Sequence, residues 1–284
     1  MFVPIHNFVL FHSVKQIAII AAFIILPLFV KSQAIRKTFE ADIQYGWILS
    51  HHEELDVFNE SVPTGFQIRY QRMGGSRENW ESCHCFHYLG VSLSVHNFGN
   101  KDELGSAVSL SGNFEPVLVR AKRFELSLGM GAGISYLTRV YDENTNPRNT
   151  FFSSPISFLL FLTPRAWLRV SDRLMVNMSF AYNHISNGGQ EKPNRGMNFP
   201  MAGIGVSYQM KSEDYPEFDQ SSFNPSWNYY AGVGFTLSDA ESGGRKSVVN
   251  LDAGMYRHIL PVIGLGGGME WTFDDTIDEE GKVR

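Results

Sequence analysis

A histidine and a serine, His184 and Ser186, stand two residues apart at the end of a strongly alternating segment. A serine hydroxyl is a weak nucleophile at its ordinary pKa and needs a neighbouring base, which an imidazole can supply. Residues two apart in a strand project from one face, about 6.5–7 Å apart along the backbone. A histidine leaning along the strand can bridge that gap, so the pair predicts a hydroxyl nucleophile with its base.

The strand that carries this pair indicates what the pair faces. Five apolar residues precede His184 on its own parity: Leu174, Val176, Met178, Phe180 and Tyr182. In a soluble protein this face would be buried in a core, whereas in a membrane barrel it faces lipid. The barrel interpretation aims the nucleophile and its base outward, where a lipid substrate would meet them.

The same alternation recurs along the chain and predicts an all-β fold. One parity is apolar with aromatic residues near the segment ends, and the other is polar or glycine, which favours an antiparallel transmembrane β-barrel over a soluble β-sandwich. Bacterial single-chain barrels have even strand counts, so we expect an even number between about 8 and 12. Eleven candidate segments occur, at about 39–50, 62–73, 87–97, 105–114, 124–138, 153–169, 173–186, 199–209, 227–238, 246–257 and 261–273.

The first 32 residues have the pattern of a secretory signal peptide. Lys15 precedes an apolar run from Ile17 to Val30, and Ser32 supplies a small residue before a cut at Gln33. The run suits a signal peptide and is short for a membrane-spanning helix, although a retained anchor is the alternative. We therefore expect a signal peptide over 1–32 and one outer-membrane β-barrel domain over 33–284.

Charge and ligand spacing exclude several classes of function. The formal net charge is −5 and no basic stripe is present, so a nucleic-acid partner is not expected. Cys83 and Cys85, the only cysteines, lie in the run Cys83-His84-Cys85-Phe86-His87, which lacks a second cluster with metal-ligand spacing. We assign no metal site and no cofactor. The run His51-His52-Glu53-Glu54 reads as a polar loop, and the small, weakly charged inward parity argues against a wide pore.

The segment from His184 to Asn198 resembles the signature of the lipid A 3-O-deacylase (PagL), or acyloxyacyl hydrolase, family of outer-membrane proteins. The matching elements are His-x-Ser-Asn and the later Pro193-Asn194-Arg195-Gly196. The resemblance implies an eight-stranded barrel that removes an ester-linked acyl chain from lipid A in the outer leaflet. It also implies Ser186 as nucleophile and His184 as base, with Asn187 and Gly188 as oxyanion or substrate-binding residues.

One position departs from the family pattern. The family has a glutamate twelve residues after the serine, and Asn198 stands there in this chain. An asparagine can orient a histidine but cannot offset the charge of an imidazolium. Glu191 is the nearest acidic residue and is the alternative, so both Asn198 and Glu191 are candidates for the third catalytic position.

These observations predict a serine esterase in the outer membrane of a Gram-negative bacterium, acting on lipid A or lipopolysaccharide without a cofactor. The alternative is a non-catalytic barrel, whether a porin, a scaffold or an inactive family member, and the missing glutamate favours it. A soluble secreted β-protein is a third reading. The oligomeric state does not follow from the sequence.

Overall fold

The computed structural model describes residues 34–81, 83–218, 226–239, 244–260 and 263–276, so the predicted signal peptide over 1–32 lies outside the described residues. Strands dominate, and each of the eleven expected segments overlaps one. The elements are β1 (Ala34–Gly46), η2 (Glu53–Phe58), β2 (Thr64–Gly74), α2 (Arg77–Glu81), β3 (His87–Asn97), β4 (Ser106–Arg120), β5 (Phe124–Leu137), β6 (Ile156–Arg169), β7 (Leu174–Ser186), β8 (Met197–Ser212), β9 (Trp227–Asp239), β10 (Arg245–Leu260) and β11 (Ile263–Asp274).

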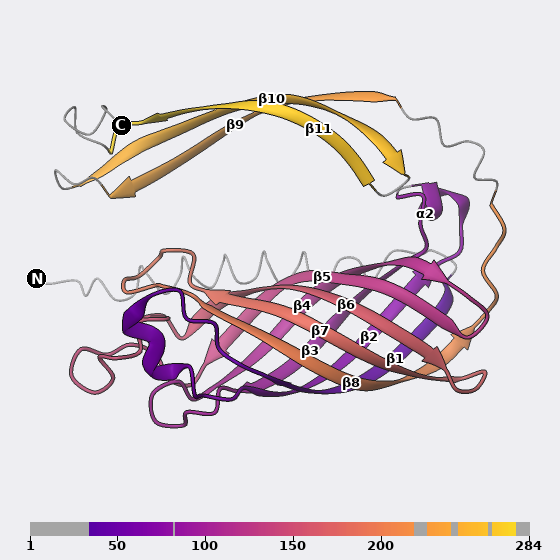
Figure 1. Ribbon diagram of the computed structural model, residues 1–284, viewed down its shortest axis with the longest axis horizontal. Coiled ribbons are helices and arrows are strands. Elements are labelled where there is room, and N and C mark those ends of the chain that lie inside the picture. Colours follow the sequence, from indigo (N-terminus) through magenta and orange to yellow (C-terminus); the bar gives the residue numbers. More distant parts are fainter. Residues whose placement is uncertain (1–33, 82, 219–225, 240–243, 261–262, 277–284) are drawn as a thin grey trace, which may run out of the picture. The chain divides into compact units, whose positions relative to one another are not determined.

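Strands β1 to β8 form a closed antiparallel barrel (Figure 1). Each strand pairs with its neighbour in sequence, and β1 closes the ring against β8, where Ile43 lies opposite Ile204. Closure leaves no strand edge exposed, which is the condition for a sheet to cross a bilayer. The predicted fold class, an all-β barrel with an even strand number, is confirmed with eight strands.

The two ends of the barrel differ in the length of their connections. The connections 47–63, 98–105, 138–155 and 187–196 lie at the end where β7 finishes, which we call the loop end. The opposite end, which we call the turn end, has the short connections 121–123 and 170–173 and the longer 75–86, which contains α2. Long loops on one side and short turns on the other are typical of outer-membrane barrels.

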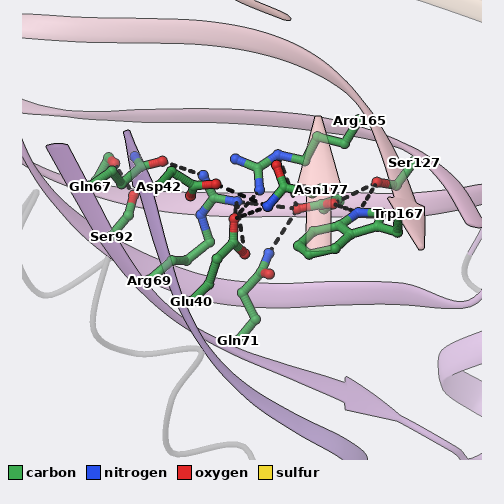
Figure 2. A network of polar contacts seen from close by, with 12 residues as sticks. Glu40, Asp42, Gln67, Arg69, Gln71, Ser92, Ser127, Arg165, Trp167 and Asn177 are labelled. Carbon is green, nitrogen blue, oxygen red and sulfur yellow. Dashed lines mark hydrogen bonds and ion pairs between the residues drawn. The ribbon is translucent and has the colours of Figure 1, made fainter. Parts of the chain in front are cut away.

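The interior of the barrel is filled. Glu40 of β1, Arg69 of β2 and Arg165 of β6 meet inside it (Figure 2). Glu115 of β4 joins them, and Arg69 lies 3.3 Å from Glu40 and 3.6 Å from Glu115. The expectation of a weakly charged interior is therefore wrong, because these charged side chains cross the lumen. Towards the loop end the filling becomes apolar, with a cluster that includes Leu55, Phe58, Phe98, Phe151, Phe152, Ile185, Met197 and Phe199.

The chain divides into two compact units, residues 1–217 and 218–284. The second unit contains a three-stranded antiparallel sheet in the order β11-β10-β9, with Val233 opposite Leu251 and Leu251 opposite Trp271. The single barrel domain expected over 33–284 thus differs from the structure, where the closed barrel spans Ala34 to Ser212. Among the described residues, no helix has the length and apolar character to span a membrane.

Candidate active site

Strand β7 presents His184 and Ser186 on the outward face of the barrel, at the loop end. The burial of the side chains follows the alternation along the strand. The inward residues Ala181, Asn183 and Ile185 are buried. On the outward parity Met178, which lies nearer the turn end, is 70% exposed, whereas His184 and Ser186 are half-buried by the loops above them. The expected orientation of this pair towards the barrel's surroundings is therefore what the structure has.

The register of β7 and β8 brings Asn198 beside His184. The two residues are directly opposite each other across the strands, and His184 Nδ1 lies 2.7 Å from Asn198 Oδ1. Because the amide oxygen can only accept, Nδ1 donates the proton in this hydrogen bond, and in the neutral form of the ring Nε2 is then the nitrogen with the lone pair. The arrangement supplies an imidazole whose free nitrogen can act as a base.

Gly196 forms the wall behind this pair. A Cβ at Gly196 would lie 2.8 Å from His184 Cε1 and 3.3 Å from both His184 Nε2 and Ser186 Cβ. The Nε2 edge of the ring and the serine therefore flank the same point in space. Within the described residues no hydrogen bond joins Nε2 to Ser186 Oγ, and catalytic hydrogen bonds are often long before substrate binds.

Asn187 holds the loop that follows β7. Its side-chain nitrogen donates to Ser153 Oγ at 3.1 Å and to the Glu191 carbonyl at 2.9 Å, while its backbone N–H donates to Asn194 Oδ1 at 3.1 Å. Both amide protons are thus engaged, and the residue is fully buried. In this arrangement Asn187 positions the loop and has no side-chain proton left for an oxyanion.

Gly188 follows two residues after the serine and lines the same groove. It adopts a positive φ of 68°, and its backbone N–H makes no hydrogen bond within the part of the chain that the structure describes. A free backbone N–H beside a nucleophile is the group that an oxyanion hole requires. Gly188 therefore suits the expected role better than the Asn187 side chain does.

Glu191 makes no hydrogen bond or ion pair with His184 in the part of the chain that the structure describes. It is exposed in the loop, and its backbone carbonyl accepts from Asn187. Of the two residues considered for the third position, Asn198 is the one in contact with His184. The cross-strand register places Asn198 beside His184, which neither spacing nor residue type could have shown.

The β1–β2 connection, which carries the polar run His51-His52-Glu53-Glu54, also reaches this site. The ring of His51 lies 2.9 Å from the carbonyl oxygen of Arg195, and Glu54 pairs with the Arg195 guanidinium at 2.9 Å. The backbone N–H of Leu49 donates to the Asn198 carbonyl at 2.8 Å. The β1–β2 connection therefore fixes both flanks of Gly196. No local sequence signal links 47–63 to the loop after β7.

A groove runs around the outside of the barrel and reaches Ser186. The register pairs His184 with Leu160, Leu160 with Ala132, and Ala132 with Gly112, so the row contains two small residues. A cavity of about 780 Å³ opens along this row, and it ends at Ser186 and Gly188. The lining is apolar and also includes Leu89, Phe114, Met130 and Phe158. Its shape and chemistry suit a hydrocarbon chain.

A family model described as "Lipid A 3-O-deacylase (PagL)" matches residues 64–211, just over half of the chain. The solved structure of the outer membrane enzyme PagL shares 12% identity and covers 58% of this chain and 97% of its own, with a TM-score of 0.44. Neisserial surface protein A shares 12% identity and covers 61% of this chain and 96% of its own, with a TM-score of 0.41. No curated protein matches the chain.

Proposed function

The chain belongs to the lipid A 3-O-deacylase (PagL) family, and from this premise we propose that it is a serine esterase that removes an ester-linked acyl chain from lipid A in the outer membrane of a Gram-negative bacterium. The family and the closed barrel support the general assignment to lipid A deacylation at that membrane. The residues, the order of the steps and the substrate contacts described below are our proposal.

In the proposed mechanism Ser186 Oγ attacks the ester carbonyl carbon while His184 Nε2 accepts the hydroxyl proton. The carbonyl oxygen becomes an oxyanion that the Gly188 N–H stabilises. The bond to the leaving sugar hydroxyl then breaks, and His184 returns the proton to that oxygen. Water repeats the sequence on the acyl-enzyme, so the products are a free fatty acid and the deacylated lipid. No cofactor is required.

The observation that carries the proposal is that Ser186, which shares the outward face of β7 with the oriented imidazole of His184, also lines the apolar groove. His184 is held by Asn198, and Ser186 lies where the groove ends. A lipid ester whose hydrocarbon chain occupies the groove would therefore present its carbonyl to Ser186. Holding the reacting groups together in this way is itself a large part of catalysis.

The asparagine at the third position favours a second candidate, an inactive member of the family. Asn198 orients the ring, but its neutral amide does not stabilise the imidazolium that forms as Ser186 attacks. A porin is disfavoured because the interior is crossed by the Glu40, Arg69, Glu115 and Arg165 network.

The experiment is mass spectrometry of lipid A from outer membranes that contain the wild-type protein, Ser186→Ala, Asn198→Glu or Ser106→Ala. Ser106 begins β4 at the same end of the barrel and serves as the matched control. We expect the wild type and Ser106→Ala to remove one acyl chain, and Ser186→Ala to lose at least about a thousandfold of the rate.

Two other outcomes are informative. Deacylation by Asn198→Glu alone would identify an inactive family member that lacks only its carboxylate. Intact lipid A with all four folded proteins would reject the deacylase assignment for this chain, and deacylation by Ser186→Ala at the wild-type rate would reject the nucleophile.

A further inference from the structure

The turn end of the barrel carries a second cluster of reactive side chains, far along the strands from Ser186. Cys83 and Cys85 follow α2, and His87 is the first residue of β3. The Sγ atoms of both cysteines and a ring nitrogen of His87 all lie within 4.8 Å of one another. Cys83 Sγ is 3.3 Å from His87 Nδ1, and the two cysteines are joined by a disulfide.

This disulfide contributes little to holding the turn in place. A bridge between residues two apart closes a very small loop and so removes little entropy from the unfolded chain. The turn has other restraints, because the backbone N–H groups of Cys83 and Cys85 both donate to the Trp80 carbonyl, at 3.4 and 3.2 Å. The Phe86 carbonyl accepts from Val117 N–H at 2.8 Å. The positions of the cysteines are therefore set by the backbone.

We propose that in the dithiol state Cys83 Sγ, Cys85 Sγ and His87 Nδ1 bind a thiophilic closed-shell cation such as Zn²⁺. Two thiolates and an imidazole are ligands that zinc prefers, at about 2.3 Å for sulfur and 2.0–2.1 Å for nitrogen. Those bond lengths place sulfur and nitrogen about 3.5 Å apart at two corners of a tetrahedron. The 3.3 Å between Cys83 Sγ and His87 Nδ1 already matches that edge.

The three candidate ligands differ in their burial. Cys85 and His87 are buried, while Cys83 is half-buried and is the side from which a cation would enter. Three protein ligands leave a fourth position for water or another small ligand. An open position is typical of zinc sites that exchange ligands, in contrast to the closed four-ligand sites that only support a fold.

The disulfide and the metal-bound form exclude each other. Opening the Cys83–Cys85 bond takes two electrons and two protons, which a dithiol donor supplies as it becomes a disulfide itself. Binding of Zn²⁺ to the resulting thiols releases their two protons, because the thiolate is the ligand. Oxidation of the two thiols would expel the cation, so occupancy of the site follows the redox state at this end of the barrel.

The test is a Zn²⁺ titration of the purified full-length protein in detergent against a chromophoric chelator, with and without prior reduction. We expect the reduced wild type to bind one Zn²⁺ per chain and the oxidised protein to bind none at this site. His87→Gln and Cys83→Ser should each weaken binding at least about tenfold. His51→Gln, at the loop end, is the control for adventitious histidine binding and should change nothing.

Two results would overturn the proposal. One is equal Zn²⁺ binding by the oxidised and reduced wild type, and the other is wild-type affinity in reduced His87→Gln. A Co²⁺ titration gives a second readout, because thiolate-to-cobalt charge-transfer absorption reports sulfur ligation directly and should fall in Cys83→Ser. Heat-modifiable migration of each variant on gels establishes that the barrel is folded. Lipid A deacylation is not the readout, so this test and that of the proposed esterase fail independently.

Discussion

At the scale of single residues, the candidate site depends on small side chains as much as on reactive ones. Gly196 leaves the space in which the Nε2 edge of His184 and the side chain of Ser186 meet. Asn187 keeps the following loop in shape through three hydrogen bonds that it donates and one, at 2.9 Å, that it accepts from Gly189. These residues belong to the same sequence motif as the pair, and they act by positioning it.

Gly196→Ala should lower kcat at least about tenfold while leaving the barrel folded. The new Cβ would lie 2.8 Å from His184 Cε1, so the ring must move away from Ser186. Gly189→Ala is the matched control, since Gly189 has a similar positive φ of 76° but no atom within 4 Å of its Cβ position. Initial rates on a lipid A substrate check this. Equal loss of rate in both variants would mean that backbone strain, and not the collision with His184, is responsible.

At the scale of elements, the sequence predicted the strands well because alternation is a local property. The segment 173–186 was expected as a strand with His184 and Ser186 on its outward face, and β7 has that form. The residue that hydrogen-bonds to His184 was not predictable in the same way, because both Asn198 and Glu191 follow it closely enough in the chain to be its partner. The register of β7 with β8 settles this, and register depends on the pairing of whole strands.

The outward groove is a second property of elements that no single strand reveals. Gly112, Ala132 and Leu160 belong to three strands, and their alignment with His184 appears only when β4 to β7 pair in register. Each strand alone reads as ordinary apolar alternation. The groove follows from small residues falling in one row, which the sequence spacing does not show.

Ala132→Phe should narrow the substrate range to shorter acyl chains. The aromatic ring would fill the middle of the groove between Gly112 and Leu160, so long hydrocarbon chains lose contact area at about 25 cal/mol per Å². Val108→Phe is the control, because Val108 is also outward on the barrel but does not line the groove. Hydrolysis of a series of esters of increasing chain length checks this. If Ala132→Phe leaves the dependence of rate on chain length unchanged, the groove does not bind the acyl chain of the substrate.

At the scale of the whole molecule, the sequence predicted a barrel but not where it ends. Strands β9 to β11 alternate as strongly as the first eight, with Val233 77% and Met269 69% exposed on the apolar parity. Local pattern cannot separate them from barrel strands, because closure of β1 on β8 is a long-range event. The charged network inside the barrel escaped prediction for a related reason, since Glu40, Arg69, Glu115 and Arg165 occur singly on four separate strands.

The segment after β8 is part of the first unit and closes its turn end. Glu213 N–H donates to the Ile35 carbonyl at 2.9 Å, and Arg36 donates to the Tyr215 hydroxyl at 2.9 Å. The Tyr215 ring lies 4.1 Å below the Arg36 guanidinium and packs edge-on to Phe86. Arg36 is buried and Tyr215 is half-buried, and a largely desolvated cation–π contact of this kind contributes up to about 2 kcal/mol. A shortened chain that ends before Tyr215 would lose these contacts and should be less stable.

A chain that ends after Glu217 should fold and deacylate lipid A at a rate within about twofold of the full chain. It keeps all eight paired strands, the groove and Tyr215, and the closed barrel leaves no strand edge to be satisfied by β9 to β11. A chain that ends after Ser212 is the comparison. It loses the Tyr215 contacts with Arg36, so the barrel should be less stable by about 2 kcal/mol or more. On gels, its heat-modifiable migration should therefore be lost at a lower temperature. If the Glu217 form folds but is inactive, β9 to β11 contribute to the reaction, and the site is larger than the one described by β7, β8 and their loops.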